Sequence, residues 1–452
     1  MELMKFENKY DWGYDYKQFC PVDDVDKFKP NGMSIDEDCQ YYDIPKYINT
    51  YLHDPIVHPS WENFRKHKKL VSSIRGEFIY PVEQFGALDK LIGQDSGYEE
   101  YCFLKHIKPS TMKRIRKGQG KIVVLAPEES MFTMSNMVHF HNELKKYKVP
   151  KCHYITGNNW TIRNDYESWC KEGGEEIKIN VINSYQQMHL KGWDLIYPSN
   201  IFGHEGKNSF VTEDDFDVRR QKRFVCLNRR IKPHRYALIG MFHKLGLLKD
   251  NLVSFSLESG KDLNHYSEYS KPNKGTLIRM LGNTELNSEI RGYYDELLEM
   301  SPRTVDYPDK QKVIGPGCET KEAYIQTYFS VVTETAFDND KCWFSTEKVY
   351  RPMLHLHPFI VYGSPYTLRE LRKKGFKTFS PFIDESYDEC ELHFYRFKKI
   401  VREVERLCSM SDNEIHEWYN GMKDILIHNR NLMEECGRQY YKVMPKILGD
   451  IK

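Results

Sequence analysis

The sequence predicts an α/β fold with two successive domains built on parallel sheets. Short apolar runs that contain β-branched residues alternate with longer amphipathic stretches, which is typical of βαβ units. This alternation begins near residue 119 and starts again near residue 219. The 452 residues, with a hydrophobic content of 40%, are enough for two or three domains with complete cores.

Residues 1–118 are expected to form an irregular N-terminal extension of short helices and loops. They carry clusters of Pro, Tyr and charged residues without a clear period. The basic stretch 107–121 ends in glycines, which indicates a linker to the first domain. The chain shows neither an apolar secretory segment near residue 1 nor a run of 18 apolar residues, so we expect no signal peptide and no membrane-spanning helix.

The first α/β domain is expected at residues 119–218. Its first strand is the apolar run IVVL, and a helix is predicted to follow over 131–148. The other predicted strands have a similar short, apolar composition. Together the predicted strands cover residues 122–125, 152–157, 177–183 and 193–199.

The second α/β domain is expected at residues 219–390. Strands and helices alternate again, and the first long helix should close near Gly246. The predicted strands are 224–228, 252–256, 328–335 and 358–363, and the predicted helices are 233–248, 287–298, 346–355 and 364–375. Residues 391–452 are expected to form C-terminal helices, one of which begins with the SDNE capping box at 411–414.

Composition is typical of a soluble protein. The net charge of +1 provides no overall attraction to nucleic acid or membranes. The 11 cysteines include no CxxC pair, so we expect reduced thiols and a cytoplasmic location. Abundant Tyr, Phe, Lys and Asn with little Ala indicate an AT-rich genome such as that of a virus, in which case the location would be the host cytoplasm.

Residues 328–355 combine a buried strand, a polar loop and a helix start. Ligands of open α/β sheets bind at the carboxyl ends of the strands. Lys348 lies in the first turn of the expected helix, where a cation opposes the helix dipole, so a bound phosphate would explain its position. The neighbouring Glu347 offers a carboxylate that can accept hydrogen bonds from two ribose hydroxyls. This segment therefore predicts a nucleotide site.

The same segment resembles the α1,3-fucosyltransferase family. Members carry an acidic residue after a buried strand, a polar loop, an aromatic residue, Thr-Glu-Lys and an apolar strand, which ends in Gly-Ser-Pro in bacterial members. The matching residues here are Glu334, Phe344, Thr346, Glu347, Lys348, Gly363 and Ser364. The resemblance covers the second domain only, with Phe344 in place of the family's tyrosine and Thr335 in place of its asparagine.

The resemblance implies a GT-B fold, in which two Rossmann-like domains face a cleft, and an inverting, metal-independent glycosyltransferase. The donor would be a GDP- or UDP-sugar bound by the second domain, and the enzyme a hexosyl- or fucosyltransferase without a cofactor. In the family the Glu contacts the donor ribose, while the Lys and an upstream arginine contact the diphosphate. Arg235 is the candidate for that arginine, with Arg229 and Arg230 as alternatives.

The general base is expected from the first domain, which would bind the acceptor. Glu128 and Glu129 follow the first strand of that domain and would face the cleft in this topology. The sequence is compatible with an acceptor hydroxyl on a glycan, on a protein or on a modified base in DNA.

Three further patterns have competing interpretations. The DND triplet at 338–340 spells Asp-x-Asp, which binds metal in another glycosyltransferase fold but is also common in polar loops. The pairs His139/His141 and His355/His357 are interpreted as structural or solvated histidines rather than as metal ligands. The basic runs 105–121 and 219–235 suggest an alternative function, a non-catalytic nucleic-acid-binding protein. No GxGxxG or P-loop motif occurs, so dinucleotide and P-loop sites have no support.

Overall fold

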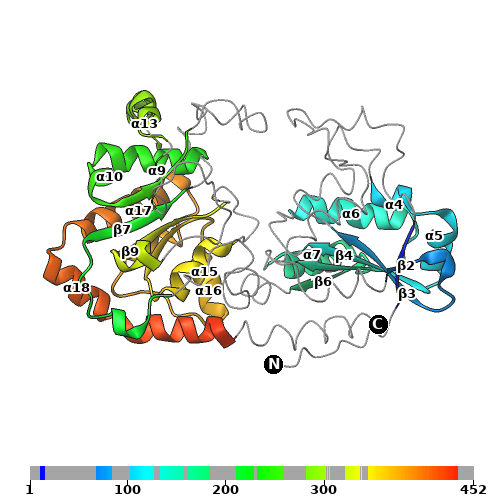
Figure 1. Ribbon diagram of the computed structural model, residues 1–452. Coiled ribbons are helices and arrows are strands. Elements are labelled where there is room, and N and C mark those ends of the chain that lie inside the picture. The colour runs from blue at the N-terminus through cyan, green and yellow to red at the C-terminus, as the bar shows by residue number, and fades with distance from the viewer. Residues whose placement is uncertain are drawn as a thin grey trace.

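The computed structural model describes residues 11–15, 68–83, 102–126, 133–156, 161–183, 210–228, 232–257, 281–282, 284–301, 303, 305, 321–335, 337 and 345–435. Within them the chain is a mixed α/β protein with two parallel sheets, one of six strands and one of four. Each sheet has its own hydrophobic core, and Figure 1 shows the sheets in separate lobes. None of the described helices combines the length and the apolar character needed to cross a bilayer.

The first sheet has the spatial order β2-β1-β3-β4-β5-β6, and every neighbouring pair is parallel. Its strands are β1 (Asp11–Tyr14), β2 (Lys68–Leu70), β3 (Phe78–Glu83), β4 (Gly120–Ala126), β5 (Cys152–Thr156) and β6 (Ile179–Asn183). All five residues of β5 are buried, as expected of a parallel strand covered on both faces. The predictions for β4, β5 and β6 are confirmed, whereas the strand predicted at 193–199 lies outside the described residues.

The prediction of an irregular N-terminal extension is wrong for the residues that the structure describes. β1, β2 and β3 form half of the first sheet, and Phe78 lies in its core. β1 and β2 contain only 4 and 3 residues, which is too short for a recognisable period. β3 contains Pro81, a residue that argues against a central strand. The predicted linker is also regular, because Pro109 starts a helix at the position where proline is favoured.

Short helices connect these strands. They are η2 (Val71–Ser73), α4 (Phe103–His106), α5 (Pro109–Arg116), α6 (Met134–Lys146) and α7 (Ile162–Gly173). The helix predicted over 131–148 is confirmed as α6. The Thr133 hydroxyl accepts from the Asn136 N–H at 3.2 Å, and the Asn136 side chain accepts from the Thr133 N–H at 2.9 Å. This reciprocal cap explains where α6 begins.

The second sheet has the order β10-β9-β7-β8, again with every neighbouring pair parallel. Its strands are β7 (Lys222–Leu227), β8 (Leu252–Ser254), β9 (Thr327–Thr333) and β10 (Phe359–Tyr362). β9 lies between β10 and β7, and all of its residues are buried. The four strands predicted for this domain are therefore confirmed.

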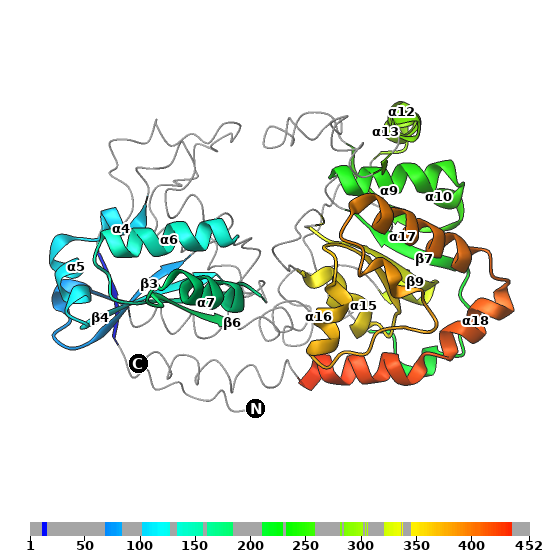
Figure 2. The ribbon, with the colours of Figure 1, turned by 180° about the vertical axis from the view of Figure 1, so that it is seen from behind.

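Helices cover this sheet, with α9 on one side of β7 and β9 and α15 on the other, as both views show (Figures 1 and 2). Gly246, at φ 71°, separates α9 from α10, so the helix predicted over 233–248 is in fact two. The helices are η5 (Glu213–Asp215), α9 (Pro233–Lys244), α10 (Leu247–Asp250), α12 (Thr284–Gly292), α13 (Tyr294–Glu299), α14 (Lys321–Ile325), α15 (Glu347–Leu354), α16 (Thr367–Lys373), η7 (Glu385–Tyr387), α17 (His393–Cys408) and α18 (Asp412–Asn420).

The C-terminal helices α17 and α18 share the core of the second sheet. Phe397 and Ile400 of α17 and Trp418 of α18 are buried in the same cluster as β9. The Trp418 ring meets the Phe329 ring edge-on, with centroids 6.0 Å apart. The predicted capping box at the start of α18 is confirmed, since the Ser411 hydroxyl and the Glu414 carboxylate cap each other's backbone N–H groups.

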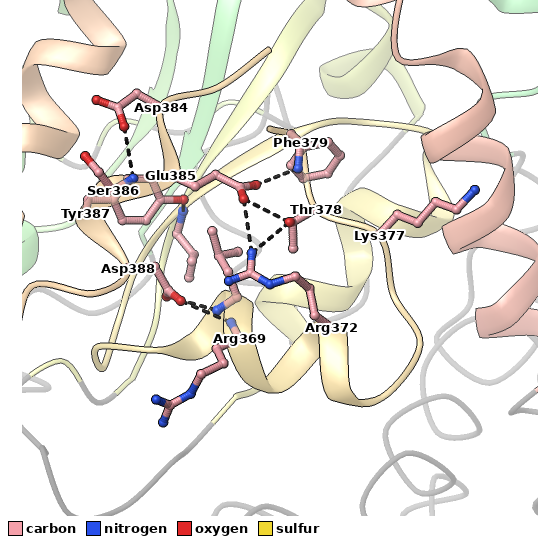
Figure 3. A network of polar contacts seen from close by, with 12 residues as sticks. Arg369, Arg372, Lys377, Thr378, Phe379, Asp384, Glu385, Ser386, Tyr387 and Asp388 are labelled. Atoms are coloured by element: carbon pink, nitrogen blue, oxygen red, sulfur yellow. Dashed lines mark hydrogen bonds and ion pairs between the residues drawn. The ribbon is translucent and has the colours of Figure 1, made fainter. Parts of the chain in front are cut away.

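A polar network ties the segment before α17 to α16 (Figure 3). Arg372 of α16 donates to the Thr378 hydroxyl at 2.9 Å and to the Glu385 carboxylate at 3.1 Å. The Asp388 carboxylate accepts two backbone N–H groups in the first turn of α16, at 2.9 and 3.1 Å. Asp388 is 2% exposed, and its burial raises the pKa of its carboxyl to about 6. These contacts fix α16 to the segment 378–388.

Candidate functional site

The candidate site lies at the carboxyl end of the second sheet, where β9 ends between its two neighbours. Glu334 and Thr335 follow β9, Asn228 follows β7, and Gly363 and Ser364 follow β10. In open α/β sheets this edge is where ligands bind. Two helices also begin here, because α9 follows β7 and α15 follows the loop after β9.

Glu334 anchors the first residue of the α15 start. Its side chain is completely buried, and its Oε1 accepts the backbone N–H of Thr346 at 2.9 Å. Its Oε2 accepts the Thr346 hydroxyl at 2.6 Å and the Thr335 N–H at 3.2 Å. A carboxylate at a helix N-terminus is favoured by the helix dipole and makes charge-assisted hydrogen bonds. Glu334 therefore fixes where α15 begins.

Thr346 and Lys348 complete this arrangement. Thr346 is the N-cap of α15, and its hydroxyl lies 3.4 Å from the Lys348 N–H. The Lys348 ammonium group folds back over the helix start and donates to the Thr346 hydroxyl at 3.0 Å and the Thr335 hydroxyl at 3.4 Å. Three of the predicted site residues, Glu334, Thr346 and Lys348, are thus brought together in space.

The first turn of α9 contacts the same strand end from the other side of the sheet. Lys232 Nζ donates to the Thr335 carbonyl at 2.9 Å. His234 Nε2 lies 2.9 Å from the Glu334 carbonyl oxygen. The N-terminal end of α9 is therefore tied to the residues that follow β9.

Arg235, the predicted phosphate ligand, lies beneath this edge. It is 4% exposed, and its Nη2 donates to the Thr333 carbonyl at 3.1 Å and to the Glu334 carbonyl at 3.5 Å. Lys232 is only half-buried and was not singled out from the sequence. Its position immediately before Pro233 at a helix start was a usable signal, because the argument made for Lys348 applies to it equally.

His234 is a neutral, buried histidine at the floor of the site. Burial and the nearby charge of Arg235 hold the pKa of His234 well below its usual range. Its ring stacks on Phe337, with centroids 4.4 Å apart, and meets the Tyr362 ring edge-on at 5.6 Å. Because Nε2 faces a carbonyl, Nε2 carries the proton and Nδ1 is an acceptor; Nδ1 has no protein partner.

Several predicted site residues fall outside the described part of the chain. They are Glu128, Glu129, Arg229, Arg230, Asp338, Asp340 and Phe344. Glu347 is the first residue of α15, but its side chain is also outside the description. The identity of the general base, the contact between Glu347 and the donor ribose, and the role of the Asp-x-Asp pattern therefore stay predictions.

The structural interpretation of three of the paired histidines is confirmed. His141 lies 2.9 Å from the Tyr166 hydroxyl, His355 stacks on Tyr324 at 4.0 Å, and His357 lies 2.7 Å from the Ser330 hydroxyl. Among the described residues, no group of three or more His, Cys, Asp or Glu side chains is placed to hold a metal ion. The six cysteines in that part of the chain are free thiols.

The basic run 219–235 does not form one surface. β7 separates its two ends by about 20 Å, since a strand rises about 3.3 Å per residue. Arg220 is 5% exposed and donates to the Tyr419 hydroxyl, and Arg223 pairs with Asp412 at 2.8 Å. In the other run, Arg114 donates to three backbone carbonyls. Much of the charge that suggested nucleic-acid binding is therefore used within the fold.

A cavity among the described residues lies away from this site. It measures about 350 Å³ and lies at the amino ends of the strands, beside Thr212, Leu356 and Arg430. Arg430 is already bound to the Val211 carbonyl at 2.6 Å and to Glu434 at 3.4 Å. The Arg430 guanidinium in the cavity lining is therefore already used by protein groups.

The sequence matches no family model and is not significantly similar to any curated protein. The resemblance to α1,3-fucosyltransferases therefore stays a prediction from the motif residues of the second domain.

Proposed function

We propose that the chain is an inverting, metal-independent glycosyltransferase of GT-B architecture that uses a GDP- or UDP-sugar. One observation supports this most directly. Glu334, Thr346 and Lys348, which match the family motif, contact one another at the carboxyl end of β9, where α15 begins. A nucleotide diphosphate bound at this helix start would meet the positive end of the helix dipole and the Lys348 ammonium group.

In the proposed reaction the acceptor hydroxyl oxygen attacks the anomeric carbon of the sugar. The bond from that carbon to the diphosphate oxygen breaks, and configuration inverts because a single displacement occurs. The acceptor proton passes to a carboxylate of the first domain, for which Glu128 and Glu129 are the candidates. The nucleoside diphosphate leaves with the additional negative charge.

The second domain would stabilise that leaving group. Lys348 would balance the charge that builds on the diphosphate, a contribution that is often the largest in such reactions. Glu334 would keep α15 in place for this, because its carboxylate holds both the N–H and the hydroxyl of Thr346. Glu347 would accept the ribose hydroxyls and so orient the nucleoside.

The proposal requires an acceptor that carries a hydroxyl group. This hydroxyl can belong to a glycan, a protein or a modified DNA base. A cytoplasmic location, or a host-cytoplasmic one for a viral protein, would suit either nucleotide-sugar donor. Incubating the chain with labelled donor and each acceptor class in turn would separate them.

The direct test is a thermal-shift screen of the full chain against GDP, UDP and their sugars. A ligand at 100 times its Kd should stabilise the folded state by roughly 2.7 kcal/mol. Activity should survive EDTA, whereas loss restored by manganese would point to Asp338 and Asp340 instead. If no nucleotide shifts the transition and DNA binds with strong salt dependence, the nucleic-acid-binding alternative would replace this proposal.

A further inference from the structure

Cationic side chains from two separate segments gather at the amino end of the first sheet. α5 leads into β4 and α6 leads into β5, and these strands are parallel neighbours, so both helices end at the same edge of the sheet. Arg116 Nε donates to the Tyr147 carbonyl oxygen at 2.8 Å, which ties the end of α5 to the end of α6. The exposed cations of this basic edge are Lys113, Arg116 and Lys117 from the first segment and Lys148 and Lys151 from the second.

The carboxylates along this end of the sheet are paired with other lysines. The pairs are Glu77 with Lys121, Glu143 with Lys146, Glu175 with Lys145 and Glu176 with Lys178. Within the part of the chain that the structure describes, no cation of the basic edge forms an ion pair. Their positive charge is therefore available to a partner in solution.

Lys148 occupies its position at a conformational cost. It follows Tyr147, the C-cap of α6, and its φ is 56°. Glycine is the usual residue in this left-handed conformation, because a Cβ atom is disfavoured there. The dipole of α6 favours cations near its end, but Lys145 and Lys146 already occupy the last turn. A lysine in place of glycine at position 148 therefore indicates that its charge is used.

The basic edge fits the phosphate backbone of a nucleic acid better than a lipid surface. Proteins that bind a membrane surface through a helix combine positive charge with apolar side chains that enter the bilayer. The large apolar side chains that are exposed in the described residues are Leu70, Ile177, Val218, Leu392 and Tyr395. None of them belongs to α5 or to residues 147–151. A phosphate backbone requires only a group of reachable cations.

We propose that the basic edge binds the phosphate backbone of a nucleic acid without reading its sequence. Contacts with phosphates position a protein on nucleic acid but carry no sequence information. The surface differs from the basic run 105–121, because Arg114 of that run is used by backbone carbonyls and Lys148 and Lys151 come from another segment. The inference goes beyond the proposed function and does not depend on it, since the donor site lies on the second sheet.

The test is fluorescence anisotropy of labelled duplex DNA of mixed sequence, titrated with the full chain at several salt concentrations. Each phosphate contact that is lost lowers the slope of log K against log salt by about 0.9. The variant Lys148→Gln/Lys151→Gln should therefore lower the slope by about 1.8 and, from this effect alone, the affinity at 0.1 M salt by about 60-fold. The matched control is Lys249→Gln/Lys377→Gln, which removes two exposed lysines of the second domain and should leave binding unchanged.

Two single variants separate the charge of Lys148 from a structural role. Lys148→Gly removes the charge and places the favoured residue at φ 56°, so its thermal midpoint should not fall below that of the wild type. Its affinity for DNA at 0.1 M salt should still fall by about eightfold. Lys148→Arg keeps the charge and should bind DNA as the wild type does.

Three results would overturn the proposal. They are an unchanged DNA affinity in the folded Lys148→Gln/Lys151→Gln variant, an equal loss in the control, and a wild type that binds phosphatidylserine vesicles but not DNA. The outcome is also distinguishable from that of the proposed function. DNA binding through the basic edge without binding of any nucleotide-sugar supports the surface and removes the glycosyltransferase, whereas binding of a nucleotide-sugar without binding of DNA does the reverse.

Discussion

Replacing Glu334 with glutamine should loosen the start of α15 and cost about 3 kcal/mol of local stability. The carboxylate accepts three hydrogen bonds, two through Oε2 and one through Oε1. The amide group of Gln must place a donor against at least one of those donors, so one bond is lost and the others lose their charge assistance. Losing a bond to a charged, buried group costs about 1.5–3 kcal/mol, and neutral bonds are roughly half as strong as charge-assisted ones.

Hydrogen exchange is the suitable assay, because the two separate cores make a single unfolding transition uncertain. Peptides that cover β9 and α15 should exchange about 100-fold faster in Glu334→Gln, since about 1.4 kcal/mol corresponds to a factor of ten. Peptides of the first sheet should be unaffected. Glu414→Gln is the matched control, because that carboxylate also caps a helix but is exposed.

A double-mutant cycle assigns the effect to the contact with Thr346. Glu334→Gln and Thr346→Val each remove one side of the 2.6 Å hydrogen bond. Residues in direct contact should show a coupling of about 1 kcal/mol or more. Additive effects, or equal exchange in the Glu334 and Glu414 variants, would refute the view that Glu334 holds the helix start.

Three other predictions concern the same domain. Lys348→Ala should abolish sugar transfer while the thermal midpoint stays near that of the wild type, because the side chain is half-buried at a helix start; full activity in this variant would remove its role. Glu347→Gln should weaken nucleotide binding by about tenfold and discriminate less between ribo- and 2′-deoxynucleotides, and calorimetry that shows no coupling between the two changes would contradict the ribose contact. Folding favours the protonated form of the Asp388 carboxyl, because burial raises its pKa from 3.8 to about 6. Its contribution to the stability of the folded state is therefore fully present below pH 3.8 and is lost as the pH rises through 6. Relative to Asp388→Asn, the wild type should therefore lose about 3 kcal/mol of local stability between pH 4 and pH 7, measured by hydrogen exchange of the peptides that cover α16, and a difference that does not change with pH would contradict this.

The sequence predicted well those helices, strands and caps whose pattern lies within one continuous segment of the chain. β4, β9 and α6 each carry enough apolar residues in one run to show a strand or helix period, and the cap before α18 is a four-residue pattern. The strand-loop-helix motif also belongs to this group, because Thr346 and Lys348 are neighbours on one helix turn.

Pairings between distant segments were decided by the tertiary structure alone. β1 and β2 are too short to bury a face by themselves, and their positions depend on pairing, because β1 pairs with β3 and β2 pairs with β1. The same reason applies at the site, where Arg235 and Lys232 look equivalent in the sequence. Their difference arises because the end of β9 offers Arg235 two carbonyls beneath the surface and leaves Lys232 at the edge beside Thr335. The period of apolar residues in the sequence shows which face of a single helix or strand is apolar. Whether a cationic side chain is buried or half-exposed depends instead on which strand end lies opposite it. The hydrogen bonds between strands determine which strand end that is.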